Sequence, residues 1–229
     1  RYRAFVLEMD RRMADNWTMN VSYALSRLYG NYDQDYSGGV AGAAVFNTSS
    51  LLNDGPGAFT ADTFRQGVLS QDRTHVLKIF GSYMPPRIDG LTLGGYLRAQ
   101  SGTPWEARGL PWGSTLTYLR YLEPAGTNRN EFWTNFDLLV GYGRRLGRFS
   151  GKVEARVLNL FNNQTPLAVD QRKYLDPRNR TIVGNPDPSC LACWTDAMVQ
   201  GTSQPNSRYG QPVTWADPRR FLLTLLLEF

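Results

Sequence analysis

The sequence predicts an all-β protein: a segment of a transmembrane antiparallel β-barrel with about seven strands and long extracellular loops. Apolar and polar side chains alternate along seven stretches, the connections between them alternate between short and long, and no comparable window has helical periodicity. No apolar run approaches the roughly 18 residues of a membrane-spanning helix. These observations exclude an α-helical membrane protein.

The alternation is clearest in the stretch 17–25. Trp17, Val21 and Leu25 fall on one face of an extended chain, and small or polar residues fill the positions between the apolar ones. Because successive side chains of a strand point to opposite faces, this period of two predicts one apolar and one polar surface. The same period predicts strands at about 2–12, 17–29, 73–84, 91–102, 132–143, 151–162 and 219–229.

The connections alternate in length along the whole chain. The short ones contain turn-forming Gly, Pro, Asp and Asn residues, whereas the long ones exceed the usual length of a structureless loop in a compact domain. Outer-membrane barrels join their strands by short periplasmic turns and long extracellular loops. The predicted turns are 13–16, 85–90 and 144–150, and the predicted extracellular loops are 30–72, 103–131 and 163–218.

The final stretch predicts a closing barrel strand. Phe221, Leu223, Leu225, Leu227 and Phe229 share one face, and a periplasmic C-terminus makes every long connection extracellular. Single-chain bacterial barrels have an even number of strands, whereas seven are predicted. The sequence also begins without Met or an apolar leader. We therefore expect residues 1–229 to be the C-terminal part of one larger barrel domain.

Several segments resemble a known family. They read DRTHVLKIFGSY at 72–83, LGGYLRAQSGTP at 93–104, LNLFNN at 158–163 and PRRFLLTLLLEF at 218–229, with NVSYALSRLYGNY at 20–32 as a further match. These segments are similar to the late strands of TonB-dependent outer-membrane receptors, most of all to the large ones with an N-terminal carboxypeptidase-regulatory-like domain. The long loops match nothing recognisable.

The resemblance implies a 22-stranded barrel in the outer membrane of a Gram-negative bacterium, closed by an N-terminal plug that this chain lacks. It implies energy-coupled uptake or export of a large or scarce ligand, with an inner-membrane energy-coupling protein acting through the plug. The other implied partners are outer-membrane lipid, the missing N-terminal strands and the assembly machinery. That machinery would recognise the terminal strand through Phe221, Leu223, Leu225, Leu227 and Phe229.

The sequence offers little for catalysis or for a cofactor. His75 is the sole imidazole and lies beside Leu77 on a predicted strand face, which favours a solvated or interfacial histidine over a catalytic base. Asp33 and Asp35 resemble the start of a calcium loop, but Tyr36 stands where an EF-hand requires Gly. We predict no enzyme activity, no cofactor and no metal site.

Charge and cysteines add two expectations. The net charge of +5 comes from basic residues scattered as singles and pairs, whereas a nucleic-acid-binding protein gathers them into a patch. Nucleic acid is therefore not an expected partner. Cys190 and Cys193 lack the second ligand pair of a zinc site. A local disulfide is predicted for them, with a free or redox-active pair as the open alternative.

Ligand contacts are expected on the outer side of the membrane. Polar and aromatic loop residues are the candidates, because binding residues concentrate in loops held by a rigid scaffold. The alternatives are a smaller outer-membrane barrel that acts as an adhesin or surface anchor, and a secreted β-sandwich that binds carbohydrate through Trp105, Trp112 and Trp194. The candidate contacts are Arg108, Trp112, Tyr118, Arg129, Trp194 and Tyr209.

Overall fold

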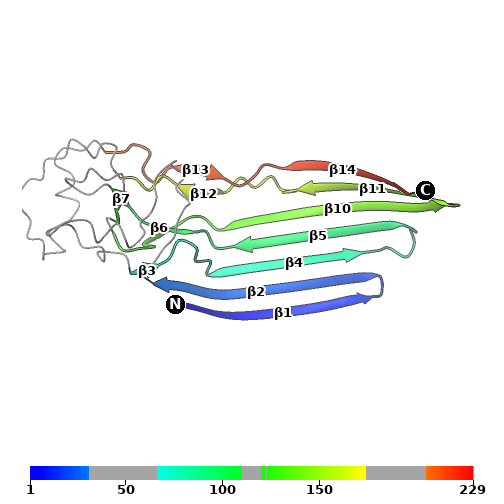
Figure 1. The fold of residues 1–229 in the computed structure, drawn as a ribbon, viewed down its shortest axis with the longest axis horizontal. Helices are drawn as coiled ribbons and strands as arrows, with labels where there is room; N and C mark the ends of the chain where they lie inside the picture. The colour runs from blue at the N-terminus through cyan, green and yellow to red at the C-terminus, as the bar shows by residue number, and fades with distance from the viewer. Residues whose placement is uncertain (31–65, 110–119, 122, 174–204, 229) are drawn as a thin grey trace, which may run out of the picture.

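A computed structural model describes residues 1–30, 66–109, 120–121, 123–173 and 205–228 (Figure 1). Every regular element in these residues is a β-strand. None of the described residues belongs to a helix with the length and hydropathy to span a membrane.

Seven long strands form the body of the structure, and each coincides with a stretch where the alternation predicts one. They are β1 Tyr2–Ala14, β2 Trp17–Gly30, β4 His75–Tyr83, β5 Leu91–Gln100, β10 Trp133–Leu146, β11 Phe149–Leu158 and β14 Arg220–Glu228. They pair in the order β1-β2-β4-β5-β10-β11-β14, and every pair is antiparallel.

Seven short strands, which the sequence analysis does not predict, lie within the long connections. Most of them pair with one another, and β3 extends the main sheet by pairing with β2. They are β3 Gly67–Val68, β6 Pro104–Trp105, β7 Arg108–Gly109, β8 Arg120–Tyr121, β9 Asn128–Arg129, β12 Pro166–Val169 and β13 Pro212–Trp215.

The short connections all lie at one end of the sheet, which we call the turn end; the long connections leave from the opposite loop end (Figure 1). Asp15 and Asn16 join β1 to β2 with φ of 51° and 65°, as a type I′ hairpin turn requires. Gly147 and Arg148 alone join β10 to β11, so this turn is tighter than the predicted 144–150 connection.

The sixth strand is shorter than the alternation predicts. The prediction extends it to residue 162, but β11 ends at Leu158. Asn159 and Asn162 have φ of 52° and 54°, in the left-handed region that asparagine tolerates better than most residues. The LNLFNN segment is therefore the end of a strand followed by a turn.

The strands are strongly staggered. A single row of paired residues begins at Arg11 near the turn end of β1 and passes through Met19, Gly81 and Leu138. It ends at Phe221, at the loop end of β14. Each strand is thus shifted along its axis relative to the one before it, as the tilted and sheared strands of a barrel are.

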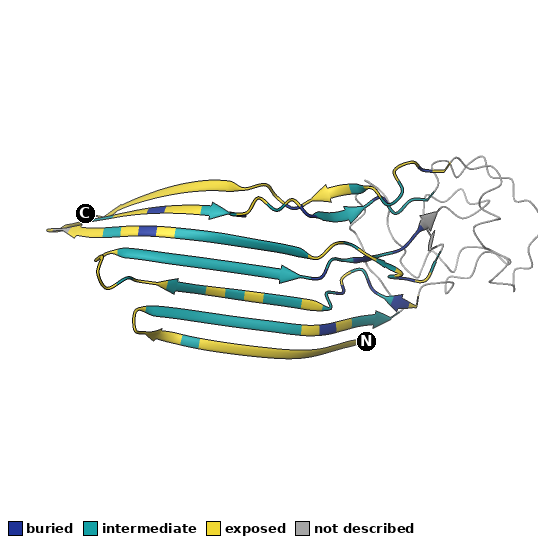
Figure 2. Ribbon diagram, turned by 180° about the vertical axis from the view of Figure 1, so that it is seen from behind, coloured by how far each residue is buried: buried dark blue, intermediate teal, exposed yellow. Residues whose placement is uncertain are grey.

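The sheet is one layer and has two open edges. Within the described residues, the buried apolar side chains Leu69, Ala107, Ala125 and Ala216 all lie outside the seven long strands. The edge strands β1 and β14 are exposed along almost their whole length (Figure 2). Each of these two strands pairs on one side only. The sheet is therefore an open, single-layer sheet without a hydrophobic core of its own.

Candidate functional site

The register of the sheet brings most apolar side chains of the seven long strands onto one surface, the apolar face; Val6, Phe80, Leu139, Leu222 and Leu226 are exceptions on the opposite surface. Directly paired residues point to the same side of a sheet, so the strand pairs extend the apolar set from one edge to the other. On the edge strands this face is open, with Phe5 63% and Leu223 76% exposed. Its members are Phe5, Leu7, Met9, Trp17, Met19, Val21, Tyr23, Leu25, Leu77, Ile79, Tyr83, Leu91, Leu93, Leu97, Phe136, Leu138, Val140, Tyr142, Val153, Ala155, Val157, Phe221, Leu223, Leu225 and Leu227.

The opposite surface, the polar face, carries most of the charged side chains of the long strands. On β11, Glu154 pairs with Lys152 at 2.6 Å and with Arg156 at 2.9 Å. The Arg98 guanidinium lies 5.5 Å from the Trp133 ring centroid and donates to Gln100. Other charged members are Glu8, Asp10, Lys78, Asp137, Arg145, Arg220 and Glu228.

Aromatic and cationic side chains meet at the turn end of the apolar face. Trp17 pairs directly with Tyr83, and the Arg11 guanidinium carbon lies 4.0 Å from the centroid of the Trp17 ring. Arg11 also forms an ion pair with Asp15 at 2.9 Å. Amphipathic side chains of this kind mark the boundary between hydrocarbon and water in membrane proteins.

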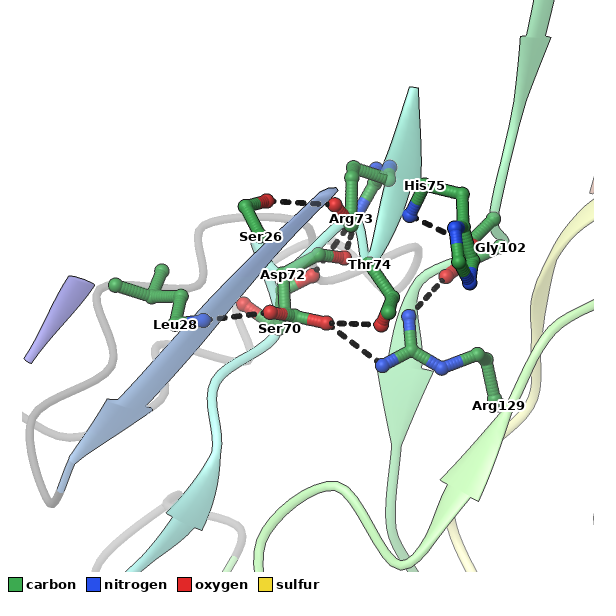
Figure 3. A network of polar contacts seen from close by, with 10 residues as sticks. Ser26, Leu28, Ser70, Asp72, Arg73, Thr74, His75, Gly102 and Arg129 are labelled. Carbon is green, nitrogen blue, oxygen red and sulfur yellow. Dashed lines mark hydrogen bonds and ion pairs between the residues drawn. The ribbon is translucent and has the colours of Figure 1, made fainter. Parts of the chain in front are cut away.

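The short strands at the loop end, together with the segments that hydrogen-bond to them, are called the loop base. Asp72 is a buried residue that connects parts of this loop base. Its carboxylate is 1% exposed and accepts hydrogen bonds from the Leu28 amide at 2.6 Å and the Thr74 hydroxyl at 3.1 Å (Figure 3). It also forms an ion pair with Arg129 at 2.7 Å. One buried carboxylate therefore joins β2, the segment before β4, and β9.

Arg129, a candidate ligand contact, is part of this network. Its guanidinium donates to the Gly102 carbonyl at 2.8 Å as well as to Asp72 (Figure 3). A Cβ at Gly102 would collide with the backbone of Asn130, so glycine is required where the loop passes so closely. Burial lowers the pKa of Arg73, and the charge of Arg129 lowers it further, while Asp72 opposes the shift.

The other candidate contacts are placed in part. Arg108 belongs to β7, and the Tyr209 ring packs edge-on against Trp105 with centroids 6.0 Å apart. Trp112, Tyr118 and Trp194 lie outside the described residues. So do Cys190, Cys193, Phe229, Asp33 and Asp35.

Asn159 is a structural residue that the sequence analysis did not single out for a role. It is 5% exposed, and its side-chain Nδ2 donates to the backbone carbonyls of Asn163 and Asp217. Its side-chain Oδ1 accepts a hydrogen bond from the backbone amide of Asn163. The Asn159 backbone amide donates to Asp137 on β10. The LNLFNN segment thus ties the ends of β10 and β11 to the residues that precede β14.

A second buried carboxylate holds the outer hairpin of β12 and β13. Asp170 accepts hydrogen bonds from the Arg172 side chain and backbone and from Asn206. Burial raises the pKa of Asp170, but these hydrogen bonds outweigh burial and hold its pKa below the usual range. The same contact raises the pKa of Arg172.

His75 has the surroundings of a strand residue. Its Nδ1 lies 2.8 Å from the Tyr23 hydroxyl, the two rings stack at 6.2 Å, and its backbone amide donates to Ser101. In the part of the chain that the structure describes, no three His, Cys, Asp or Glu side chains cluster closely enough to hold a metal ion.

These features define a class: an all-β antiparallel sheet of seven long strands with one apolar face, one polar face and its long connections at one end. No protein-family profile and no solved structure matches the chain.

A search of known proteins finds similarity to the TonB-dependent transporter Oar of Myxococcus xanthus, at 30% identity over 182 residues. The alignment covers 74% of this chain and 16% of the relative, so the chain spans about a sixth of that protein's length. The chain is a distant partial homologue of this transporter.

Proposed function

We propose that residues 1–229 are the C-terminal part of the β-barrel of a TonB-dependent outer-membrane transporter. The observation that carries the proposal is the continuous apolar face of a single-layer sheet. Burying such a face in a soluble protein requires a second layer, whereas a membrane barrel buries it in lipid. The opposite face, with its ion pairs and hydrogen-bonding groups, then lines the lumen.

The similarity to the transporter Oar supports the same family and an outer-membrane location. The two open edges also support a larger barrel, because an unpaired strand edge cannot face lipid and must pair with further strands. In the complete barrel, β1 pairs with a strand upstream and β14 pairs with the first strand of the barrel. The 22-strand count and the plug follow from the family resemblance.

The orientation we propose places the turn end in the periplasm and the loop end outside the cell. Turns of two to seven residues at one end and connections of tens of residues at the other match the asymmetry of bacterial barrels. The terminal strand then serves as the assembly signal through Phe221, Leu223, Leu225, Leu227 and Phe229. The external ligand meets loop residues, with Arg108, Trp112, Tyr118, Arg129, Trp194 and Tyr209 as the candidates.

Transport by this mechanism needs a plug and an inner-membrane energy-coupling protein. The test is to express the full-length gene product in a Gram-negative host, fractionate the membranes and compare folded with heat-denatured mobility on gels. We expect an outer-membrane barrel preceded by a plug domain. A product that stays soluble without detergent contradicts the proposal, and a small barrel without a plug favours an adhesin or surface anchor.

A further inference from the structure

We propose a binding site for an anionic phospholipid in a groove at the turn end of β10, β11 and β14. This inference rests on the proposed membrane location. The groove has a volume of about 430 Å³, in the usual range for ligand pockets of about 300–1,000 Å³. Seven of its ten lining residues belong to the apolar face by register, so the groove opens on that face. These seven are Tyr142, Arg144, Phe149, Gly151, Val153, Leu225 and Leu227.

The groove exists because a glycine occupies the centre of an otherwise filled row. Gly151 pairs with Arg144 on one side and with Leu227 on the other. A Cβ added at Gly151 would meet only the Leu227 side chain, at an ordinary distance of 3.7 Å. Tyr142 and Phe149, which are 42% and 51% exposed, form part of the rim.

The charge at the mouth of the groove identifies the occupant. Arg144 lies on the apolar face and Arg148 lies in the turn between β10 and β11. The other charged lining residues, Lys152 and Glu228, belong to the polar face, where Lys152 forms an ion pair with Glu154. Arg144 is exposed, and its guanidinium forms no hydrogen bond or ion pair with another described residue. A cationic group at the boundary of an apolar groove complements a phosphate that is attached to acyl chains.

The binding mode follows from this geometry. An acyl chain lies over Gly151 and along the side chains of Val153 and Leu227, and the lipid phosphate accepts hydrogen bonds from the Arg144 guanidinium. The occupant comes from the leaflet that contacts the turn end. An uncharged segment of another protein would leave Arg144 without a partner next to an apolar surface.

The test uses the full-length protein in nanodiscs that contain equal amounts of phosphatidylglycerol and phosphatidylcholine. Native mass spectrometry then counts the lipids that each barrel retains after release. We compare Arg144→Gln with Gly151→Leu, which fills the groove. The matched control is Arg87→Gln, which removes an exposed arginine from the β4–β5 turn at the same end of the sheet. Heat-modifiable gel mobility checks that each variant is folded.

We expect the wild type and Arg87→Gln to retain phosphatidylglycerol preferentially. Arg144→Gln should lower that preference about fivefold, the effect of one cation near a membrane surface. Gly151→Leu should reduce retention of both lipids. Equal retention by all folded variants overturns the lipid site, as does a dimer that forms through the groove and disappears in Gly151→Leu. A protein that never enters nanodiscs contradicts the proposed function itself.

Discussion

The seven-stranded sheet and the loop base are built by different physical means. The sheet is one layer, and its apolar side chains face outward without a packed partner. The loop end buries polar groups, among them Asp72, Glu106 and Asn159, beside the few buried apolar side chains of the described residues, Leu69, Ala107, Ala125 and Ala216. Each of these buried polar side chains has hydrogen-bond partners.

This difference indicates which surroundings each region needs. A sheet with a bare apolar face gains its stability from the medium that covers it, which we propose is lipid. The loop base gains its order from satisfied hydrogen bonds and ion pairs, which need no membrane. Substitutions in the two regions should therefore respond differently to detergent, lipid and pH.

The largest effect is expected from Asp72→Ala in the loop base. The change leaves the Arg129 guanidinium without its ion pair, and the Leu28 amide and the Thr74 hydroxyl without their acceptor. Loss of one partner from a buried ion pair costs about 3–5 kcal/mol. Hydrogen exchange should show rapid opening at Leu28 while the centre of β5 stays protected. Unchanged exchange at Leu28 would show that Asp72 does not hold the loop base.

The next effect separates the two faces of β14. Leu223→Arg places a charge on the apolar face and should destabilise the folded barrel in lipid by about 2–4 kcal/mol. Thr224→Arg places the same charge on the polar face opposite Glu154 and should be nearly neutral. Urea unfolding in lipid vesicles measures both. Equal destabilisation by the two variants would mean that the faces are not distinguished by lipid.

A smaller effect is expected from pH in the hairpin of β12 and β13. The pKa of Asp170 is lowered in the folded state, so its ionised form stabilises the hairpin above the ordinary value of 3.8. That contribution is lost as the pH falls through the lowered folded pKa. Fluorescence of Trp215 on β13 should report the acid opening, and Asp170→Asn should remove this pH dependence. A variant that opens at the same pH as the wild type would show that another group controls the transition.

The smallest effect is expected from Asp15→Asn at the turn end, which removes the charge but keeps a residue that tolerates the positive φ of 51°. The Arg11–Asp15 ion pair is exposed, and exposed pairs contribute about 0–1 kcal/mol. Arg11 keeps its contact with the Trp17 ring in this variant. Urea unfolding should therefore change by less than about 1 kcal/mol. A loss as large as that of Asp72→Ala would remove the contrast between exposed and buried ion pairs.

The long strands could be predicted from the sequence because their pattern is local. Each carries its own alternation, and a hairpin such as that at Asp15 and Asn16 has a local turn signal. The predicted strand at 91–102 corresponds to β5 at Leu91–Gln100, for example. The alternation also indicated that the strands have one apolar and one polar face.

The loop base could not be predicted in the same way because its contacts join distant segments. Asp72 was part of a segment that resembles a family, but its partner Arg129 lies 57 residues away. The two-residue strands are too short to show a period. Asn159 falls within the predicted strand 151–162, whereas its left-handed backbone and its amide contacts end the strand.

The central claim is that the apolar face meets lipid and the polar face meets water. The most direct test attaches a nitroxide to successive positions from Leu91 to Ala99 of β5, in full-length protein with Cys190 and Cys193 changed to Ser. Accessibility to oxygen and to a water-soluble nickel chelate is then measured in lipid vesicles. We predict high oxygen accessibility at Leu93, Gly95 and Leu97, which share the apolar face, and higher chelate accessibility at the alternate positions Thr92, Gly94, Tyr96 and Arg98. Uniform accessibility along β5 would contradict the account.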